Sequence, residues 1–253
     1  MEQLHTKQFL LTVSAGKRLI AKAAATLSQV THALEFGTIA VIAGTTNAYV
    51  AEELLLRIGQ ADDFCKDHFF RGATTMPGKT GPQPNHADVI IEKGQWKKEQ
   101  TIFDCADRLG GGDIVFKGAN AVNLQKRQAG ILVGNPTLGT VGPAIQASAG
   151  RRAELIVPVG MEKRVTADIM ELAVQLNSPT SSGLRFLPVC GTVLTELDAV
   201  RQLTGAVAEL IAGGGICGAE GSCWIAATGN DQQLKALSGL MERVGKEPSF
   251  CKE

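Results

Sequence analysis

The sequence predicts an α/β protein with a Rossmann-like, mostly parallel sheet covered by helices on both faces, followed by a small C-terminal α+β domain of ferredoxin-like kind. Two observations support this prediction. Four apolar runs of strand length each end in small and polar residues, and segments with helical periodicity follow several of them. After residue 184 the order changes to strand, helix, two strands joined by a glycine-rich turn, and a final helix.

The first apolar run, residues 38–43, is the strongest of the four. Six consecutive apolar or β-branched residues favour a strand buried on both faces, and the run ends at Gly44, Thr45, Thr46 and Asn47 before helix-forming residues begin. A strand, polar turn and helix in this order present free backbone N–H groups at a helix N-terminus, where an anion is favoured. The turn therefore indicates a phosphate or carboxylate site, or alternatively a simple helix cap formed by Thr46 or Asn47.

The three later runs repeat this design. Residues 113–116, 129–133 and 153–159 read as strands, and each is followed by residues that can form part of a binding site: Lys117, Gly118, Ala119 and Asn120 after the second run, Gly134, Asn135 and Thr137 after the third, and Lys163 after the fourth. Ligands of open α/β sheets bind outside the carboxyl ends of the strands. We therefore expect these turns to face one pocket for a small anionic metabolite, with Lys117 and Asn120 nearest the reacting centre.

Two further segments carry candidate ligand groups. A helix with apolar residues every three or four positions is expected over residues 16–34, and Lys17 and Arg18 at its start either meet an anion or form a solvated basic pair. Residues 62–86 are rich in Gly and Pro and are typical of a lid, with Arg71 as a candidate ligand contact.

The expected domain boundary falls in the polar segment 177–183, which gives a Rossmann-like domain over residues 1–178 and a small α+β domain over residues 184–253. The small domain either forms one wall of the binding cleft or serves as an oligomerisation surface. We expect a homo-oligomer.

Composition excludes several classes of protein. The 25 basic and 25 acidic residues cancel, so a nucleic-acid partner is not expected, and no apolar stretch is long enough to cross a membrane. The six cysteines are dispersed without a CxxC pair, which gives no support for a zinc site. We expect no metal and no cofactor, and a cytoplasmic protein because the N-terminus lacks the pattern of a signal peptide.

In their order along the chain, these residues resemble the superfamily of ribose-5-phosphate isomerase A, glucosamine-6-phosphate deaminase and CoA transferases, and most closely the isomerase branch. That branch has a Gly-Thr-Gly-Ser-Thr phosphate loop, which Gly44-Thr45-Thr46-Asn47 resembles with one glycine missing. Its Asp-Gly-Ala-Asp-Glu strand end corresponds to Lys117-Gly118-Ala119-Asn120-Ala121, and its Lys-Gly-Gly-Gly turn corresponds to residues 134–142. The resemblance also implies that Lys163 contacts a phosphate.

The departures from that pattern bear on the reaction. The carboxylates of the isomerase are replaced here, and its glutamate base has no counterpart in residues 140–143, so the chain is not expected to be a standard ribose-5-phosphate isomerase. Two hypotheses follow: an isomerase or transferase acting on a sugar phosphate or CoA ester, or a non-catalytic sensor that retains the anion pocket. They differ in whether a general base reaches the pocket, for which the candidates are Asp113, Glu162, His68 and His86.

Overall fold

The computed structural model describes residues 3–71 and 87–250 and confirms the α/β class. Its largest sheet has six strands in the order β10 (Thr192–Leu194), β8 (Glu154–Pro158), β5 (Ile114–Phe116), β2 (Thr38–Val41), β3 (Val89–Glu92) and β4 (Gln95–Lys97). The first four strands run parallel, whereas β3 and β4 are antiparallel to their neighbours. The main sheet is therefore mixed, and its parallel half contains three of the four expected strands.

The fourth expected strand lies elsewhere, which corrects the prediction that residues 129–133 join the parallel sheet. β7 (Gln128–Val133) pairs in antiparallel fashion with β6 (Ala121–Asn123) and β9 (Arg185–Val189) in a separate three-stranded sheet. The connection from β6 to β7 is too short for the crossover that a parallel neighbour requires, so the chain forms a hairpin instead.

Different elements cover the two faces of the main sheet. One face packs against α1 (Val13–Thr26), α2 (Ser28–Phe36) and α3 (Thr45–Arg57). The other face packs against the β6-β7-β9 sheet, α4 (Val141–Ile145) and residues 102–109. Helices thus lie on both faces as expected, but on the second face a three-stranded sheet takes much of the place that helices were expected to fill.

The helix expected over residues 16–34 is two helices. The side chain of Thr12 caps α1 by accepting a hydrogen bond from the Ala15 N–H at 3.2 Å. Leu27 is in an extended conformation, with φ −63° and ψ 134°, and separates α1 from α2. The apolar periodicity continues through this break, which is why the sequence alone predicts one element.

A third sheet is built from both ends of the chain. β1 (His5–Leu11) pairs with β12 (Ser222–Gly229), which also pairs with β11 (Val207–Gly214), and all neighbours are antiparallel. Two helices, α6 (Glu196–Thr204) and α7 (Asp231–Val244), pack against this small sheet. The expected domain 184–253 therefore lacks β1, and it begins with β9 and β10, which belong to the other two sheets.

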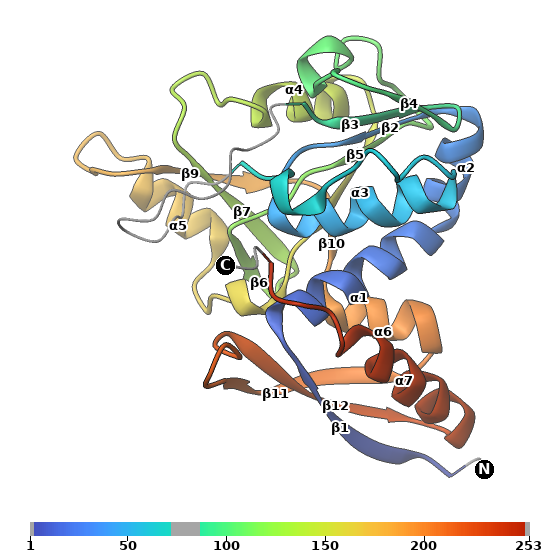
Figure 1. Ribbon diagram of the computed structural model, residues 1–253. Coiled ribbons are helices and arrows are strands. Elements are labelled where there is room, and N and C mark those ends of the chain that lie inside the picture. The colour runs from blue at the N-terminus through green and yellow to red at the C-terminus, as the bar shows by residue number, and fades with distance from the viewer. Residues whose placement is uncertain (1–2, 72–86, 251–253) are drawn as a thin grey trace.

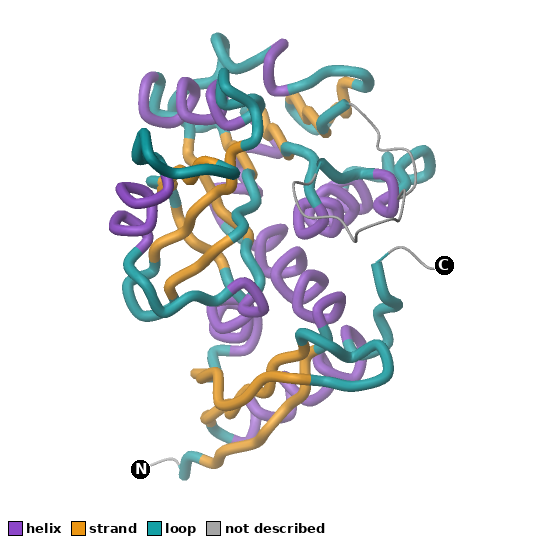
Figure 2. Tube along the Cα trace, turned by 90° about the vertical axis from the view of Figure 1, so that its left-hand side faces the viewer, coloured by secondary structure: helices purple, strands orange, loops and turns teal. Residues whose placement is uncertain are grey.

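Helix α1 lies between the main sheet and the small sheet (Figure 1), and Figure 2 shows helices filling the space between the two. Ile20 and Ala24 belong to the core of the main sheet, whereas Leu19 and Ala23 belong to the core of the small sheet. All four side chains are fully buried. The remaining elements are α5 (Ile169–Leu176), three 3₁₀ turns at Lys66–His68, Ile102–Asp104 and Met161–Lys163, and a π turn at Gln146–Gly150.

Candidate functional site

A hollow of about 460 Å³ lies at the carboxyl ends of β2, β5 and β8. Four segments line most of it: residues 43–47 after β2, Arg71, residues 117–120 after β5, and residues 162–163 after β8. These segments come together because the parallel strands that precede three of them end at the same edge of the sheet. We call this hollow the strand-end pocket.

The N-terminus of α3 opens into the strand-end pocket. Gly44 occupies the cap position in an extended conformation, with φ 173°, and no side chain in the described part of the protein caps the helix. The side chain of Asn47 donates to the carbonyls of Ile42 at 2.8 Å and Phe116 at 3.0 Å, which ties the helix to the ends of β2 and β5. The structure therefore contradicts the alternative in which Thr46 or Asn47 serves only as the helix cap.

Two buried polar atoms at this helix end have no hydrogen-bond partner among the described residues. They are Thr46 Oγ1 and Asn47 Oδ1, and both residues are at most 2% exposed. Both residues also line the strand-end pocket. A buried polar atom without a partner is costly, so these two atoms are suited to hydrogen bonds with a bound molecule.

Cationic side chains line the same pocket. Lys117 follows β5, Lys163 donates to the Ala119 carbonyl at 3.1 Å, and Arg71 pairs with Asp88 at 2.7 Å. Burial lowers the pKa of Lys117 to about 8, with smaller contributions from Lys163 and Arg71 in the same direction, while Asp88 acts in the opposite direction. At pH 7 Lys117 is therefore mostly a charged ammonium group, with a minor uncharged fraction far larger than that of an exposed lysine.

The sequence analysis missed Asp88, which organises one side of this site. Its carboxylate is fully buried and accepts hydrogen bonds from the Ala43 N–H at 2.9 Å and the Ile102 N–H at 2.8 Å, besides its ion pair with Arg71. This network joins the start of β3 to the end of β2 and directs Arg71 to the pocket. The sequence does show an acidic residue directly before an apolar strand. It does not show the hydrogen-bond partners of Asp88, because they are far away in the sequence.

Lys17 and Arg18 do not form the solvated basic pair that was one of their two expected alternatives; Arg18 meets anionic groups, which are carboxylates of the protein itself. Lys17 is buried and donates to Thr45 Oγ1 at 3.1 Å, so it supports the pocket wall from α1. Arg18 forms ion pairs with Glu52, Glu53 and Glu247, at 2.9 Å for Glu53 and 2.8 Å for Glu247. Neither side chain belongs to a solvated basic pair.

One of the candidate bases, Glu162, lines the strand-end pocket. Asp113 is occupied elsewhere, because its carboxylate accepts from the N–H groups of Thr38 at 2.7 Å and Gly110 at 2.8 Å. His68 is not among the residues that line the pocket, and His86 lies outside the described residues.

A second carboxyl group, Glu196, lies behind Glu162 and was also missed by the sequence analysis. Glu196 begins α6, is 3% exposed, and accepts a hydrogen bond from the Met161 N–H at 2.9 Å. Burial first, and then repulsion by the Glu162 carboxylate, raise the pKa of Glu196. A proton on Glu196 removes the repulsion between the two carboxyl groups.

Glycines make room for both carboxyl groups. A Cβ atom at Gly160 would stand 1.9 Å from Glu162 Oε2, and a Cβ atom at Gly16 would stand 2.5 Å from Glu196 Oε1. Any larger residue at either position would displace a carboxyl group.

The structure brings together most, but not all, of the expected site residues. Nine of them line the strand-end pocket: Gly44, Thr45, Thr46, Asn47, Lys117, Gly118, Ala119, Asn120 and Lys163. Asn120 is partly engaged in the fold, because its Oδ1 accepts from the Leu132 N–H at 3.0 Å. Its amide N–H₂ group is the part that can meet a ligand.

The other three expected residues are not among those that line the pocket. Gly134, Asn135 and Thr137 are exposed in the loop after β7, where Asn135 Oδ1 accepts from the Thr137 N–H and hydroxyl, both at 2.8 Å. β7 belongs to the antiparallel sheet; Leu132 near its end still lines the pocket, but the loop that follows β7 is not part of the lining. The expected counterpart of the Lys-Gly-Gly-Gly turn therefore does not take part in this pocket. Of the expected lid over residues 62–86, only residues up to Arg71 lie within the described part.

Comparison of the chain with protein-family models, curated proteins and solved structures found no match. Within the described residues, no helix is long and apolar enough to span a membrane. Over the same residues, no group of three or more His, Cys, Asp and Glu side chains is arranged to hold a metal ion. The geometry of the strand-end pocket is thus the basis for a functional conclusion.

Proposed function

We propose that the protein is a cytoplasmic enzyme that binds a small phosphorylated or carboxylated metabolite in the strand-end pocket and moves a proton next to its carbonyl group. The observation that carries the proposal is the convergence of an uncapped helix N-terminus, the unpartnered buried hydroxyl of Thr46 and three cationic side chains on one hollow. The proposal includes the Rossmann-like architecture and the relationship to the sugar-phosphate isomerase and CoA transferase superfamily that the strand-end motifs imply.

The anionic group of the metabolite is placed at the start of α3. The free N–H groups of the first helical turn and the helix dipole favour negative charge there. Lys163 and Arg71 add positive charge around the same hollow. Thr46 Oγ1 can donate its hydroxyl proton to the anion, which gives this buried group a partner.

Lys117 and Glu162 supply the chemistry. The ionised Glu162 removes a proton from the carbon next to the carbonyl, and the electron pair of that C–H bond moves to form an enolate. The substrate is an α-hydroxy carbonyl compound, so the carbon that loses its proton also carries a hydroxyl group. The ammonium form of Lys117 gives a proton to the enolate oxygen and the resulting amine takes the proton of that hydroxyl group. Glu162 then returns the first proton to the former carbonyl carbon, and the carbonyl group has moved by one carbon, which completes an isomerisation. With a pKa of about 8, Lys117 is able both to release a proton to the substrate oxygen and to take one up at neutral pH.

A non-catalytic sensor is the second candidate, and one observation favours it. The oxygens of Asn120 and Ala119 are already used within the protein, by the Leu132 N–H and Lys163 Nζ respectively. Fewer groups are then available to act on a bound molecule than the number of lining residues suggests. In this case the pocket binds the same anions without changing them.

A ligand screen followed by an exchange measurement tests the proposal. Sugar phosphates, CoA esters, nucleotides and folates are added singly to the protein, and a compound that binds the native state raises the melting temperature. We expect an anionic compound to stabilise the wild-type protein, and this shift to be lost in Lys117→Ala but kept in Lys7→Ala, which removes an exposed lysine of β1. Equal shifts in both variants would refute the pocket assignment.

The bound compound is then incubated in D₂O and followed by NMR. The enzyme proposal predicts incorporation of deuterium next to the carbonyl, and loss of this incorporation in Glu162→Gln with binding retained. Binding without deuterium incorporation by the wild-type protein would identify a sensor instead.

A further inference from the structure

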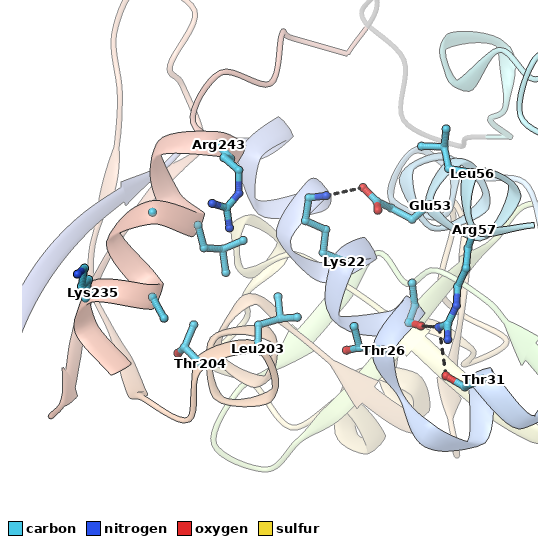
Figure 3. A pocket seen from close by; sticks show the side chains of 14 residues that line it. Lys22, Thr26, Thr31, Glu53, Leu56, Arg57, Leu203, Thr204, Lys235 and Arg243 are labelled. Atoms are coloured by element: carbon cyan, nitrogen blue, oxygen red, sulfur yellow. Dashed lines mark hydrogen bonds and ion pairs between the residues drawn. The ribbon is translucent and has the colours of Figure 1, made fainter. Parts of the chain in front are cut away.

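A second hollow, larger than the strand-end pocket, lies away from it. It has a volume of about 960 Å³ and lies between α1 and α3 on one side and α6 and α7 on the other. Figure 3 shows the side chains that line it, with Lys22, Glu53 and Arg57 on one wall and Arg243 and Lys235 on the opposite helix. We call it the helix groove.

The charges of the helix groove do not balance. Its lining includes Lys22, Arg57, Lys235 and Arg243, and Glu53 is the one acidic residue among the described residues that line it. Glu53 is already paired with Lys22 at 3.1 Å and with Arg18 at 2.9 Å. Among the described residues, the remaining three cations form no ion pair with a carboxylate. The groove therefore offers positive charge to an outside molecule.

Arg57 is held in place without a carboxylate. Its guanidinium donates to the Ala25 carbonyl and to Thr31 Oγ1, the latter at 3.1 Å, and Figure 3 shows these bonds as dashed lines. These bonds fix the side chain at the end of α1 while leaving its charge uncompensated. A cation held in this way is oriented before a partner arrives, which lowers the entropy cost of binding.

The surface between these cations is mixed, with Thr26, Thr31 and Thr204 beside apolar residues. Leu203 and Leu240 lie in the groove, and Leu56 on α3 is 58% exposed at its side. Apolar side chains flanked by cations are complementary to an amphipathic segment that carries acidic residues.

Gly239 gives an independent indication of an occupant. It lies within α7 and lines the groove, and a Cβ atom there would meet only Arg243 Nη1, at an ordinary 3.6 Å. Packing inside the protein therefore does not require glycine, although glycine is a poor residue for a helix interior. Together with Ala236 one turn earlier, it lets the backbone of another chain approach α7 closely.

From the charge, the apolar side chains and Gly239 together, we propose that the helix groove docks an acidic, amphipathic helix of a partner protein. Lys235 and Arg243 are eight residues apart on α7, which corresponds to roughly 12 Å along the axis. That length matches about two turns of a docked helix, whose acidic side chains would reach both cations. Small residues at 236 and 239 would receive the docked helix backbone.

The test uses the full chain and synthetic helical peptides as probes. The peptides carry leucines at helical spacing on one face and glutamates on the other, with varied positions of both. Lysine replaces glutamate in one control set, and serine replaces leucine in another. Fluorescence anisotropy measures the affinity of each peptide for wild type, for the double variant Lys235→Glu with Arg243→Glu, and for a matched control, Lys7→Glu with Lys93→Glu, which reverses two exposed lysines outside the groove.

We expect at least one glutamate-leucine peptide to bind the wild-type protein and the matched control alike, with an affinity loss of tenfold or more in the groove variant. Gly239→Ala is expected to raise the melting temperature by about 2–4 °C because alanine is the better helix former. The same substitution should weaken peptide binding, because the added methyl group occupies the space of the docked backbone. If Gly239 had only a structural role, the substitution would not both raise the melting temperature and weaken peptide binding.

Three results would overturn the proposal. The first is that no acidic peptide binds more tightly than its lysine control, and the second is that binding persists in the groove variant. The third is evidence that the helix groove binds a different occupant. Binding of pyrophosphate, but not of the peptides, with the same sensitivity to charge reversal would assign a small-anion site. Self-association of the wild-type chain in sedimentation, lost in the groove variant, would assign an interface between two copies.

Discussion

The strand-end pocket and the helix groove lie along the same helix, yet they hold their charges in different ways. Lys17 of α1 contacts Thr45 at the pocket, and Lys22 and Ala25 of α1 line the groove. At the pocket, the acidic groups Asp88 and Glu196 are buried; Asp88 is paired with Arg71, and Glu196 lies behind Glu162. In the groove, Lys235 and Arg243 are exposed and form no ion pair among the described residues.

The difference shows what each region is suited to. Buried charges cost free energy to desolvate, but they are held in position and their pKa values shift, which suits chemistry on a small molecule. Exposed charges are nearly neutral for stability and are screened by salt, which suits attraction of a partner. Substitutions in the two regions should therefore have very different consequences for folding.

The largest expected effect is that of Arg18→Ala, which removes the buried cation between the two regions. Its three glutamate partners would be left without that charge, so we expect the free energy of unfolding to fall by about 3–5 kcal/mol in urea titrations. Lys235→Ala in the groove is the comparison, with an expected change within about 0.5 kcal/mol. Similar losses of unfolding free energy in both variants would show that burial does not determine how much a charged side chain contributes to stability.

Asp88→Asn should have the next largest effect. The new amide keeps one oxygen for the backbone N–H groups but places a donor where an acceptor stood, so we expect a loss of about 1–3 kcal/mol in unfolding free energy. The substitution also removes a negative charge that raises the pKa of Lys117, so that pKa should fall further. An unchanged titration of Lys117 would place Asp88 outside the electrostatics of the pocket.

Glu196→Gln should change how stability depends on pH. Because the folded-state pKa of Glu196 is raised, its protonated form contributes stability that is fully present below the unfolded pKa and is lost as pH rises through the folded value. The glutamine variant should therefore lose less stability than wild type between weakly acidic and weakly alkaline pH. Parallel curves of unfolding free energy against pH would contradict the assignment. Because Glu196 lies behind the proposed base Glu162, Glu196→Gln should also shift the pH profile of deuterium exchange into the bound compound.

The smallest effect concerns the amine of Lys117 and leaves stability almost unchanged. Reductive methylation of this amine, followed by mass spectrometry across a pH series, should show a midpoint near pH 8 in the folded protein. In the urea-unfolded chain the midpoint should return to about 10.5. Lys117→Ala should keep the melting temperature within a few degrees of wild type; a large drop would identify Lys117 as a structural residue.

Local patterns predicted the centre of the site. The run over residues 38–43, the polar turn and the following helix are all adjacent in the sequence, so their geometry follows from strand and helix preferences alone. Lys117 was found in the same way, as a polar residue directly after an apolar strand. Such features need no knowledge of distant contacts.

Features that depend on distant pairing were missed or misplaced. The run over residues 129–133 has the composition of a buried strand, but its partners in β6 and β9 decide which sheet it joins. Most of β1 is exposed, so it gives a weak pattern until β12 pairs with it. Asp88 and Glu196 matter because of groups far away in the sequence, and no spacing rule indicates them.

The pairing of β1 with β12 has a consequence for synthesis of the protein. His5 pairs with Gly229, so the first strand leaves the ribosome long before its neighbour exists. Until then, the side of α1 that carries Leu19 and Ala23 has no core to enter, because β12, α6 and α7 provide most of that core. A nascent chain that stops before residue 222 would thus expose the apolar face of α1 and the unpaired edge of β1. Both surfaces favour aggregation or binding by chaperones.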